Sequence, residues 1–419
     1  MGCLAARPST FAVPKDLPNN KSLKSILNND INNLLISSSG ASISSQEYKR
    51  SVRGLLAARP LVLAQNVGMP DPVIYRSKVG THWNKHIVEI SLKTWPKSNP
   101  TRVRETAQIQ AAAMRSLVAM GTDPLELTIE VCRQKGVLIL ASYRMNAEDW
   151  HKNTWMLSDF GRAHEQSRIP DTGALDPMDP EVYNHRKDLF REVAENFDID
   201  GIEFDYMRWN HMISKPRENY PILTREVSET RKMLDEVARK KGRERLILGA
   251  RVGYSLDGPP VGRSDFSCKD LGLDIKNWID RGLVDYLCPS YFWPRLPGMP
   301  KTTEFVELAK NSKTGIYPTV FPYAAWQDEP KQTLIAETNK EAMARLLREI
   351  CQAGLKGYAE GADGLSTFNW VHHHQPGMVH NPMRTGWGLG SKKVQMRAHQ
   401  NLGSPAALRE CLKAGMTEG

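Results

Sequence analysis

The sequence of 419 residues contains six cysteines, and they lie far apart along the chain. This density is too low for a fold held together by disulfides, and no Cys/His spacing matches a zinc site. We therefore expect ordinary buried thiols at most of these positions. The positions are Cys3, Cys132, Cys268, Cys288, Cys351 and Cys411.

A long apolar run is also missing. No segment approaches the roughly 18 apolar residues that a membrane-spanning helix needs, so we expect no membrane span. The first residues, MGCLAARPST, lack the apolar core of a signal peptide. Cys3 is compatible with the remnant of a trimmed export signal. The localisation therefore stays open between periplasmic or secreted, with the signal removed, and cytoplasmic.

The sequence has no tract of Lys or Arg, although 56 basic and 47 acidic residues give a net charge of +9. An acidic partner fits this charge, whereas the scattered positions of the basic residues argue against nucleic acid. With 40% hydrophobic and 25% charged residues, the composition is that of a soluble globular protein. Nothing in the sequence indicates an oligomeric state.

Two parts of the chain differ in composition. Residues 1–55 are rich in Ser, Asn and Lys, and we predict a peripheral N-terminal arm with a short helix around 21–35. Residues 56–419 alternate between short apolar runs and helical patterns, and we predict that they form one catalytic domain with a C-terminal extension.

The apolar runs of the second part predict strands, and the amphipathic stretches between them predict helices. The strands are predicted at 59–67, 72–77, 137–144, 201–209, 246–253, 284–293, 315–323 and 362–370. Helices are predicted at 101–120, 124–135, 180–196, 223–241, 269–282, 303–312 and 337–356. Eight such units predict an α/β fold, a single (β/α)8 TIM barrel. An open doubly wound sheet is the main alternative, weakened by the absence of a GxGxxG motif.

Two acids stand inside the predicted strand 201–209. Glu203 and Asp205 are two residues apart, so alternation along the strand sends both side chains to the same side. Neighbouring carboxylates raise one pKa and leave the other group ionised, which suits acid–base or nucleophilic catalysis. The alternative is a structural role, in which arginine salt bridges hold both acids.

Cleavage of a glycosidic bond needs two carboxyl groups that flank it, about 5–5.5 Å apart for retention or about 6.5–9.5 Å for inversion. The side chains of Glu203 and Asp205 run parallel, so both would lie on one side of a sugar. A third acid from another loop is therefore a further expectation. Its candidates are Glu148, Asp149, Asp257, Asp265 and Asp328.

The ends of the predicted strands carry polar and aromatic residues, and the chemistry of such barrels is found at these ends. We predict the following substrate-binding residues: Arg144, Asn146, Trp150, Tyr206, Arg208, Trp209, Arg251, Tyr291, Trp293, Asn369, Trp370 and His372. A single tryptophan usually has a packing role. Six of them follow strand ends, however, and aromatic faces around an acid-containing cleft indicate a sugar ligand: Trp150, Trp155, Trp209, Trp293, Trp326 and Trp370.

Three arginines accompany the two acids at these strand ends. Arg144, Arg208 and Arg251 exceed the number of carboxylates, so one guanidinium group would be left for a ligand. Planar guanidinium groups match carboxylate and sulfate groups, which predicts an anionic, uronate- or sulfate-bearing sugar. We expect no cofactor and no metal, because the histidines at 372–374 and 380 lack the spacing and carboxylates of a known metal site.

The run DGIEFDYMRW, preceded by LDPMDPEVY and a helix, resembles the signature of a family-10-like glycosyl hydrolase group, which comprises uncharacterised bacterial glycoside-hydrolase-like (β/α)8 barrel proteins. SYRMNAEDW, GARVG, VDYLCPSYFW and ADGLSTFNW also resemble bacterial proteins of polysaccharide-degrading lineages. By this resemblance, Asp205 occupies the position of the nucleophile in α-amylase-type barrels. Glu203 stands where that type has arginine, and Met207 where chitinase-like proteins have glutamate, so no mechanism can be transferred.

The sequence therefore predicts a glycoside hydrolase that acts on a polysaccharide or oligosaccharide through Asp205 and Glu203. One alternative is a non-catalytic carbohydrate-binding protein on a degenerate barrel, which would keep the aromatic and arginine residues. Another is a polysaccharide lyase that uses Tyr143, Tyr206 or a histidine as its base. The linkage, the sugar and the stereochemical outcome cannot be inferred from the sequence.

Overall fold

A computed structural model shows how the chain folds. It describes residues 17–30, 34, 42–83, 112–145, 157–170, 172–207, 212–261, 266–291, 299–320, 340–368 and 392–415.

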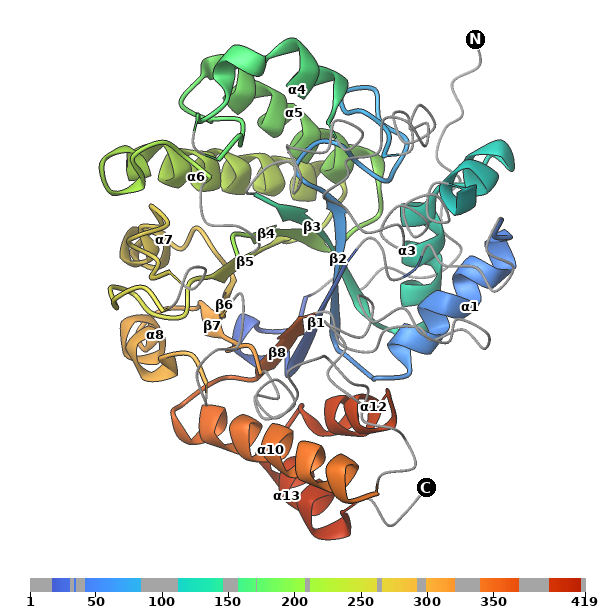
Figure 1. The fold of residues 1–419 in the computed structure, drawn as a ribbon, viewed down its shortest axis with the longest axis vertical. Helices are drawn as coiled ribbons and strands as arrows, with labels where there is room; N and C mark the ends of the chain where they lie inside the picture. Colours follow the sequence, from blue (N-terminus) through green and yellow to red (C-terminus); the bar gives the residue numbers. More distant parts are fainter. Residues whose placement is uncertain are drawn as a thin grey trace.

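Eight parallel strands form a nearly closed barrel that helices surround (Figure 1). The strands are β1 (Ser25–Asn29), β2 (Val62–Gly68), β3 (Leu138–Arg144), β4 (Gly201–Asp205), β5 (Ile247–Val252), β6 (Tyr286–Pro289), β7 (Gly315–Ile316) and β8 (Leu365–Phe368). Their order is β7-β6-β5-β4-β3-β2-β1-β8. Thr319, just after β7, pairs with Ser366 of β8 and brings the two edges together. The predicted (β/α)8 barrel is confirmed.

The first strand differs from the prediction. Residues 25–29, which we assigned to a peripheral arm with a helix at 21–35, form β1 between β2 and β8. The predicted strand 72–77 is wrong, because this segment contains isolated bridges of Val73 and a cis peptide bond before Pro72. The segment belongs to the loop after β2. The division into an arm and a domain at residue 55 therefore places one barrel strand on the wrong side.

The helices begin where the sequence offers capping residues. Asp123 accepts hydrogen bonds from Leu125 N and Glu126 N at the start of α3, and Asp179 accepts from Glu181 N at the start of α5. A proline occupies the first position of both helices, where its missing N–H has no cost. The described helices that surround the barrel include α1 (Ser45–Leu56), α3 (Pro124–Lys135), α4 (Asp159–Ala163), α5 (Pro180–Asn196), α6 (Pro216–Lys240), α7 (Ile275–Asp280), α8 (Thr302–Ala309) and α10 (Lys340–Ala359).

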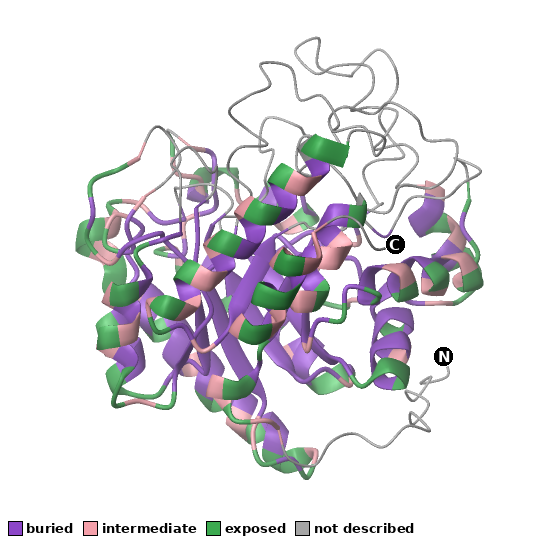
Figure 2. Ribbon diagram, turned by 90° about the horizontal axis from the view of Figure 1, so that it is seen from below, coloured by how far each residue is buried: buried purple, intermediate pink, exposed green. Residues whose placement is uncertain are grey.

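Two apolar layers hold the fold together. The outward faces of the strands pack against the helices in one large core, and the inward faces fill the barrel with a smaller cluster that includes Ile26, Leu140 and Tyr286. Figure 2 shows the strands buried at the centre and the helices exposed on their outer sides. The carboxyl ends of all eight strands therefore meet at one end of the barrel, where the inward residues become polar.

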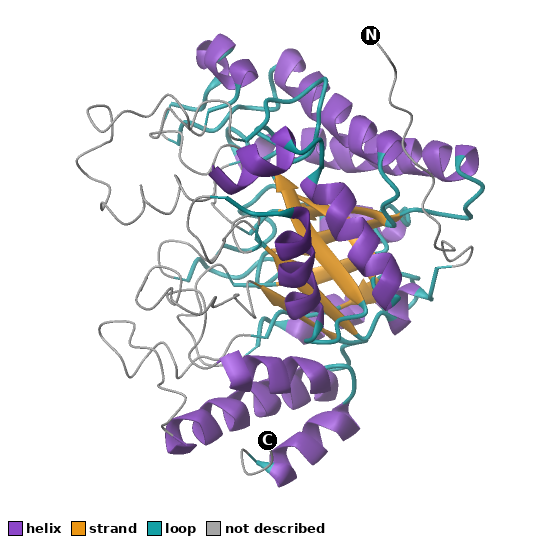
Figure 3. Ribbon diagram, turned by 90° about the vertical axis from the view of Figure 1, so that its right-hand side faces the viewer, coloured by secondary structure: helices purple, strands orange, loops and turns teal. Residues whose placement is uncertain are grey.

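In the described part of the chain after the barrel, two helices are seen, α12 (Lys392–Asn401) and α13 (Pro405–Ala414), and both pack with α10 (Figure 3). No helix among the described residues is both long enough and apolar enough to cross a bilayer.

Candidate active site

Glu203 and Asp205 lie on the inward face of β4, at the carboxyl end of the barrel. The register pairs them with Ser142 and Arg144 of β3 on one side and with Gly249 and Arg251 of β5 on the other. Both carboxyl groups are buried, at 0% and 1% exposure. The structure thus brings the two acids together on one face, as the period of a strand requires.

Neutral donors hold the Glu203 carboxyl group. Asn28 Nδ2 donates to Oε1 over 2.5 Å, Ser142 Oγ donates to the same oxygen over 3.0 Å, and Tyr286 Oη donates to Oε2 over 2.6 Å. Burial, and then the charge of Asp205, raise the pKa of Glu203 above its ordinary value, against the lowering effect of these hydrogen bonds. The structural alternative from the sequence predicted an arginine salt bridge for Glu203. Among the described residues, no arginine pairs with it.

Gly249 makes the contact between Tyr286 and Glu203 sterically feasible. A Cβ atom at this position would lie 2.0 Å from Cζ of the Tyr286 ring. The ring therefore occupies the space that a side chain on β5 would fill, and its hydroxyl reaches across to β4. Sequence reasoning missed this pair, but an isolated glycine within the apolar run LILGARV is a signal of close approach.

Asp205 is paired with Arg251 of the neighbouring strand. Arg251 Nη1 lies 3.0 Å from Oδ1 and 3.1 Å from Oδ2, and Met207 N donates to Oδ1 over 2.9 Å. The guanidinium group of Arg251 also donates from Nε to Ser290 Oγ over 3.1 Å and lies 3.8 Å from the centre of the Phe368 ring. Arg251 therefore neutralises Asp205 and is fixed on several sides.

Arg144 forms an ion pair with Asp30, at the end of β1. Asp30 is buried at 6% exposure and was not among the predicted acids, because β1 itself was not predicted. Asp30 directly after β1, Arg144 on β3, Asp205 on β4 and Arg251 on β5 thus alternate in sign around the mouth of the barrel.

Aromatic residues lie beside this row of charges. Tyr291, a predicted substrate-binding residue, stacks on Tyr254 with ring centres 5.1 Å apart, and both cluster with Phe368. All three rings are buried. Sequence reasoning missed Tyr254, two residues after β5, and Phe368, the last residue of β8, because it relied mainly on tryptophans for aromatic contacts at the strand ends.

Tyr206 does not fit the substrate-binding role that we predicted. Its ring lies 5.8 Å from that of Trp278 on α7 and 6.1 Å from that of Phe204, in the layer between the sheet and the helices. Alternation explains this position, because residue 206 is out of phase with 203 and 205. Tyr143 likewise points outward and shares a hydrogen bond of 2.7 Å with Tyr75. Burial raises the pKa of Tyr143 and of Tyr206, so neither suits a lyase base.

Many predicted site residues lie outside the described part of the chain: Asn146, Trp150, Trp155, Arg208, Trp209, Trp293, Trp326, Asn369, Trp370 and His372. The same holds for four of the five candidate third acids, Glu148, Asp149, Asp265 and Asp328. The fifth, Asp257, is exposed and pairs with Lys269 over 2.5 Å. Among the described residues, no cluster of His, Cys, Asp and Glu could hold a metal ion.

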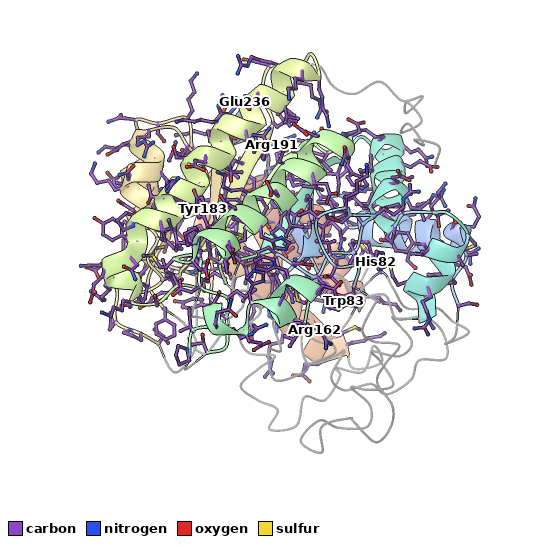
Figure 4. The ribbon with its side chains drawn as sticks, turned by 90° about the horizontal axis from the view of Figure 1, so that it is seen from above. His82, Trp83, Arg162, Tyr183, Arg191 and Glu236 are labelled. Atoms are coloured by element: carbon purple, nitrogen blue, oxygen red, sulfur yellow. The ribbon has the colours of Figure 1, made fainter. Side chains whose placement is uncertain are left out.

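A charged hollow of about 320 Å³ also lies between α5 and α6, away from the strand ends. Figure 4 labels two of its lining residues, Arg191 of α5 and Glu236 of α6. Arg191 Nη2 lies 3.6 Å from Glu236 Oε2, and Lys187 Nζ lies 2.5 Å from Glu229 Oε2. These charged side chains of the hollow therefore pair with one another. For this reason we place the candidate site at the barrel mouth instead.

The described chain is thus a (β/α)8 barrel that holds a buried carboxylate pair at the end of its fourth strand. No known family model matches it. It is similar to the curated protein "Glycosyl hydrolase DigH" of Escherichia coli K12, with 23% identity over 211 residues that cover 42% of this chain and 47% of the relative. The protein of that name from Shigella flexneri gives the same values. The chain thus spans about half the length of the curated relatives that it matches.

Solved structures show a more distant similarity. A family GH18 chitinase from Cycas revoluta gives a TM-score of 0.46 at 10% identity, with 91% of this chain and 100% of that chain covered. An α-L-fucosidase from Paenibacillus thiaminolyticus gives a TM-score of 0.45 at 13% identity, with 94% and 49% covered. Neither comparison is close enough to assign an activity.

Proposed function

We propose that this protein is a glycoside hydrolase that acts on a polysaccharide or oligosaccharide at the carboxyl end of the barrel. The observation that carries the proposal is the pair of buried carboxyl groups on β4, one with a raised pKa and one held by an arginine. Such a difference between neighbouring acids is typical of sites that combine a proton donor with an anion. The partial similarity to curated glycosyl hydrolases supports the same reaction class.

In this proposal Asp205 is the reacting anion, as nucleophile or as base. Its charge is stabilised by Arg251 and by the N–H of Met207. Glu203 precedes Asp205 by two residues on β4 and lies deeper in the barrel. We assign it the protonated form, because two neighbouring carboxylates would repel each other if both were ionised.

Asp30 is the acid that could face Asp205 across a sugar. Three strand spacings of about 4.8 Å separate β1 from β4 along the barrel wall, and inward-pointing side chains shorten that span. We therefore expect the separation of the Asp30 and Asp205 carboxyl groups to fall near the roughly 5–9.5 Å found in glycoside hydrolases. We therefore propose Asp30 as the general acid or base that β4 alone cannot supply.

An anionic substrate is a finer proposal. The net charge of +9 favours it. Of the three arginines predicted at the strand ends, however, the structure describes two, and each has a carboxylate partner: Arg144 pairs with Asp30, and Arg251 pairs with Asp205. An anionic group would therefore have to share a guanidinium with an acid, and the salt dependence of binding tests this idea.

A non-catalytic carbohydrate-binding protein is the second candidate. It is favoured by the complete hydrogen bonding of Glu203 and by the ion pair of Asp205, since both are features of a structural network. A panel of plant, marine and cell-wall polysaccharides separates the two functions. Release of reducing ends, absent in Asp205→Asn, supports the hydrolase, whereas binding without turnover of any bound polysaccharide supports the second candidate.

A further inference from the structure

Three helices from the last part of the described chain, α10, α12 and α13, form one packed unit beside the barrel. The helix α10 leads into β8, and α12 and α13 pack against it (Figure 1). His399 of α12 ties the unit to the barrel, because its ring nitrogens lie 3.0 Å from Thr367 Oγ1 of β8 and 3.1 Å from the carbonyl oxygen of Ala58. A covalent link between α10 and α13 would therefore affect how α13 is held against the barrel.

The contacts between α10 and α13 fix their register. A Cβ atom on Gly354 would lie 2.9 Å from Leu408 Cδ1, so the two helices approach closely there. The Tyr358 hydroxyl donates to the carbonyl oxygen of Leu402 over 2.7 Å. Residue numbers thus rise along α10 while those of its partners fall, as in an antiparallel pair. One turn from Gly354 and Leu408, this register places Cys351 opposite Cys411.

The two thiols are buried where the register brings α10 and α13 together. Both residues belong to the large core cluster, at 0% and 4% exposure. The pKa of Cys411 is lowered to about 6 because the Cys351 thiol hydrogen-bonds to it, and Arg397 on α12 adds a hydrogen bond and a positive charge. The other described cysteines, Cys132 of α3, Cys268 between β5 and α7, and Cys288 of β6, lie in separate parts of the fold, and burial raises the pKa of each.

We propose that Cys351 and Cys411 are a redox-active dithiol, which closes to a disulfide between α10 and α13 when a low-molecular-weight disulfide such as oxidised glutathione is present. The Cys411 thiolate attacks one sulfur of the oxidant, forms a mixed disulfide and releases one glutathione thiolate, which takes up a proton. The Cys351 thiol then loses its proton to water and attacks the Cys411 sulfur, and the second glutathione leaves. Two electrons pass from the protein dithiol to the oxidant, and two reduced glutathione molecules result.

The structure gives the reaction a direction and a consequence. Cys411 is the attacking group because its thiolate is stabilised, and it lies in the last turn of α13, where the hydrogen bonds of a helix open most readily. The new bond would join residues 351 and 411 and restrict the unfolded chain between them, so the oxidised protein should be the more stable form. The bond would also fasten α13 to the helix that leads into β8.

The experiment uses the full chain, reduced and then incubated with oxidised glutathione. We expect the loss of two thiols, a peptide linked through Cys351 and Cys411 after digestion without reductant, and a melting temperature several degrees higher that dithiothreitol reverses. Cys411→Ser and Cys351→Ser should abolish the shift, whereas Cys3→Ser should retain it. Arg397→Gln should slow oxidation and move its pH dependence to higher pH, while the same bond still forms at the end.

The peptide map of the wild-type protein needs no variant, so a variant that fails to fold does not weaken the test. A folded protein that keeps all six thiols, or that carries glutathione without the internal bond, would overturn the proposal. A disulfide between any other two cysteines would overturn it as well.

Discussion

Arg251 Nη1 lies within hydrogen-bonding distance of both carboxylate oxygens of Asp205, 3.0 Å from Oδ1 and 3.1 Å from Oδ2. Both side chains are buried at 1% exposure, so neither charge is solvated by bulk water. A buried pair of this kind either stabilises a reacting carboxylate or serves the fold alone. The first prediction separates these two roles.

Asp205→Asn should lower kcat by at least about three orders of magnitude if Asp205 reacts with the substrate. The variant keeps the shape of the side chain, but Arg251 loses its counter-charge. We also expect a loss of stability below the roughly 3–5 kcal/mol that breaking a buried ion pair costs, because the amide oxygen still accepts a hydrogen bond. Initial rates per folded molecule and denaturant unfolding give the two quantities.

Asp285→Asn is the matched control for this variant. Asp285 is equally buried and pairs with Arg231 and Arg245, but it lies at the amino end of β6, away from the site. It should lose stability and keep its kcat. Full activity in folded Asp205→Asn would show that Asp205 has a structural role.

Glu203 should make stability depend on pH in the opposite direction from an ordinary salt-bridged acid. Its pKa is raised in the folded protein from an unfolded value of 4.5, so its contribution is fully present below pH 4.5 and is lost as the pH rises through the folded pKa. Glu203→Gln cannot ionise. The free energy of unfolding of this variant should therefore gain on that of the wild type between pH 4 and pH 8. Parallel pH profiles of the two proteins would contradict the raised pKa.

His399 should destabilise the protein in mild acid. Burial lowers its pKa from 6.5 to about 4, so the folded protein holds it neutral and the unfolded chain protonates it first. Its contribution is present above pH 6.5 and is lost as the pH falls toward 4, at a cost of up to roughly 3 kcal/mol. Urea unfolding of the wild type and of His399→Gln across this range measures the difference between their free energies of unfolding. The wild type should lose stability relative to the variant as the pH falls. A difference that does not change with pH would show that the folded protein already protonates the ring at pH 6.

The anionic-substrate proposal predicts a selective effect at Arg144. Arg144→Met should weaken binding of an anionic oligosaccharide about 10- to 100-fold, the range for a charge-assisted hydrogen bond. The carboxyl-reduced or desulfated analogue should lose much less, and rising salt should weaken the anionic ligand alone. Calorimetric titration of both ligands decides the matter. Equal losses would show that Arg144 serves only Asp30.

Arg243→Met is a suitable control for Arg144→Met. Arg243 pairs with Asp200 over 2.7 Å at the other end of the barrel. The substitution therefore removes a buried arginine without changing the mouth of the barrel. It should leave the affinity for both ligands unchanged.

Local rules were enough to predict most of the barrel. The strands β3 to β8 lie within their predicted apolar runs, and the predicted bounds of α5 are those observed, because capping and periodicity are properties of neighbouring residues. The common face of Glu203 and Asp205 also follows from the period of a strand. The outward position of Tyr206 follows from the same rule, which should have excluded it from the predicted site.

Contacts between distant residues decided the remainder. The strand β1 is SILNN, a short segment within a polar region, and it becomes a strand because β2 and β8 pair with it on both sides. Asn28 and Glu203 are 175 residues apart and form one hydrogen bond inside the barrel. The sequence by itself determined which residues can face inward, because side-chain direction is local. Only the closed barrel decided which inward residues meet, because closure places strands that are far apart in sequence around one interior.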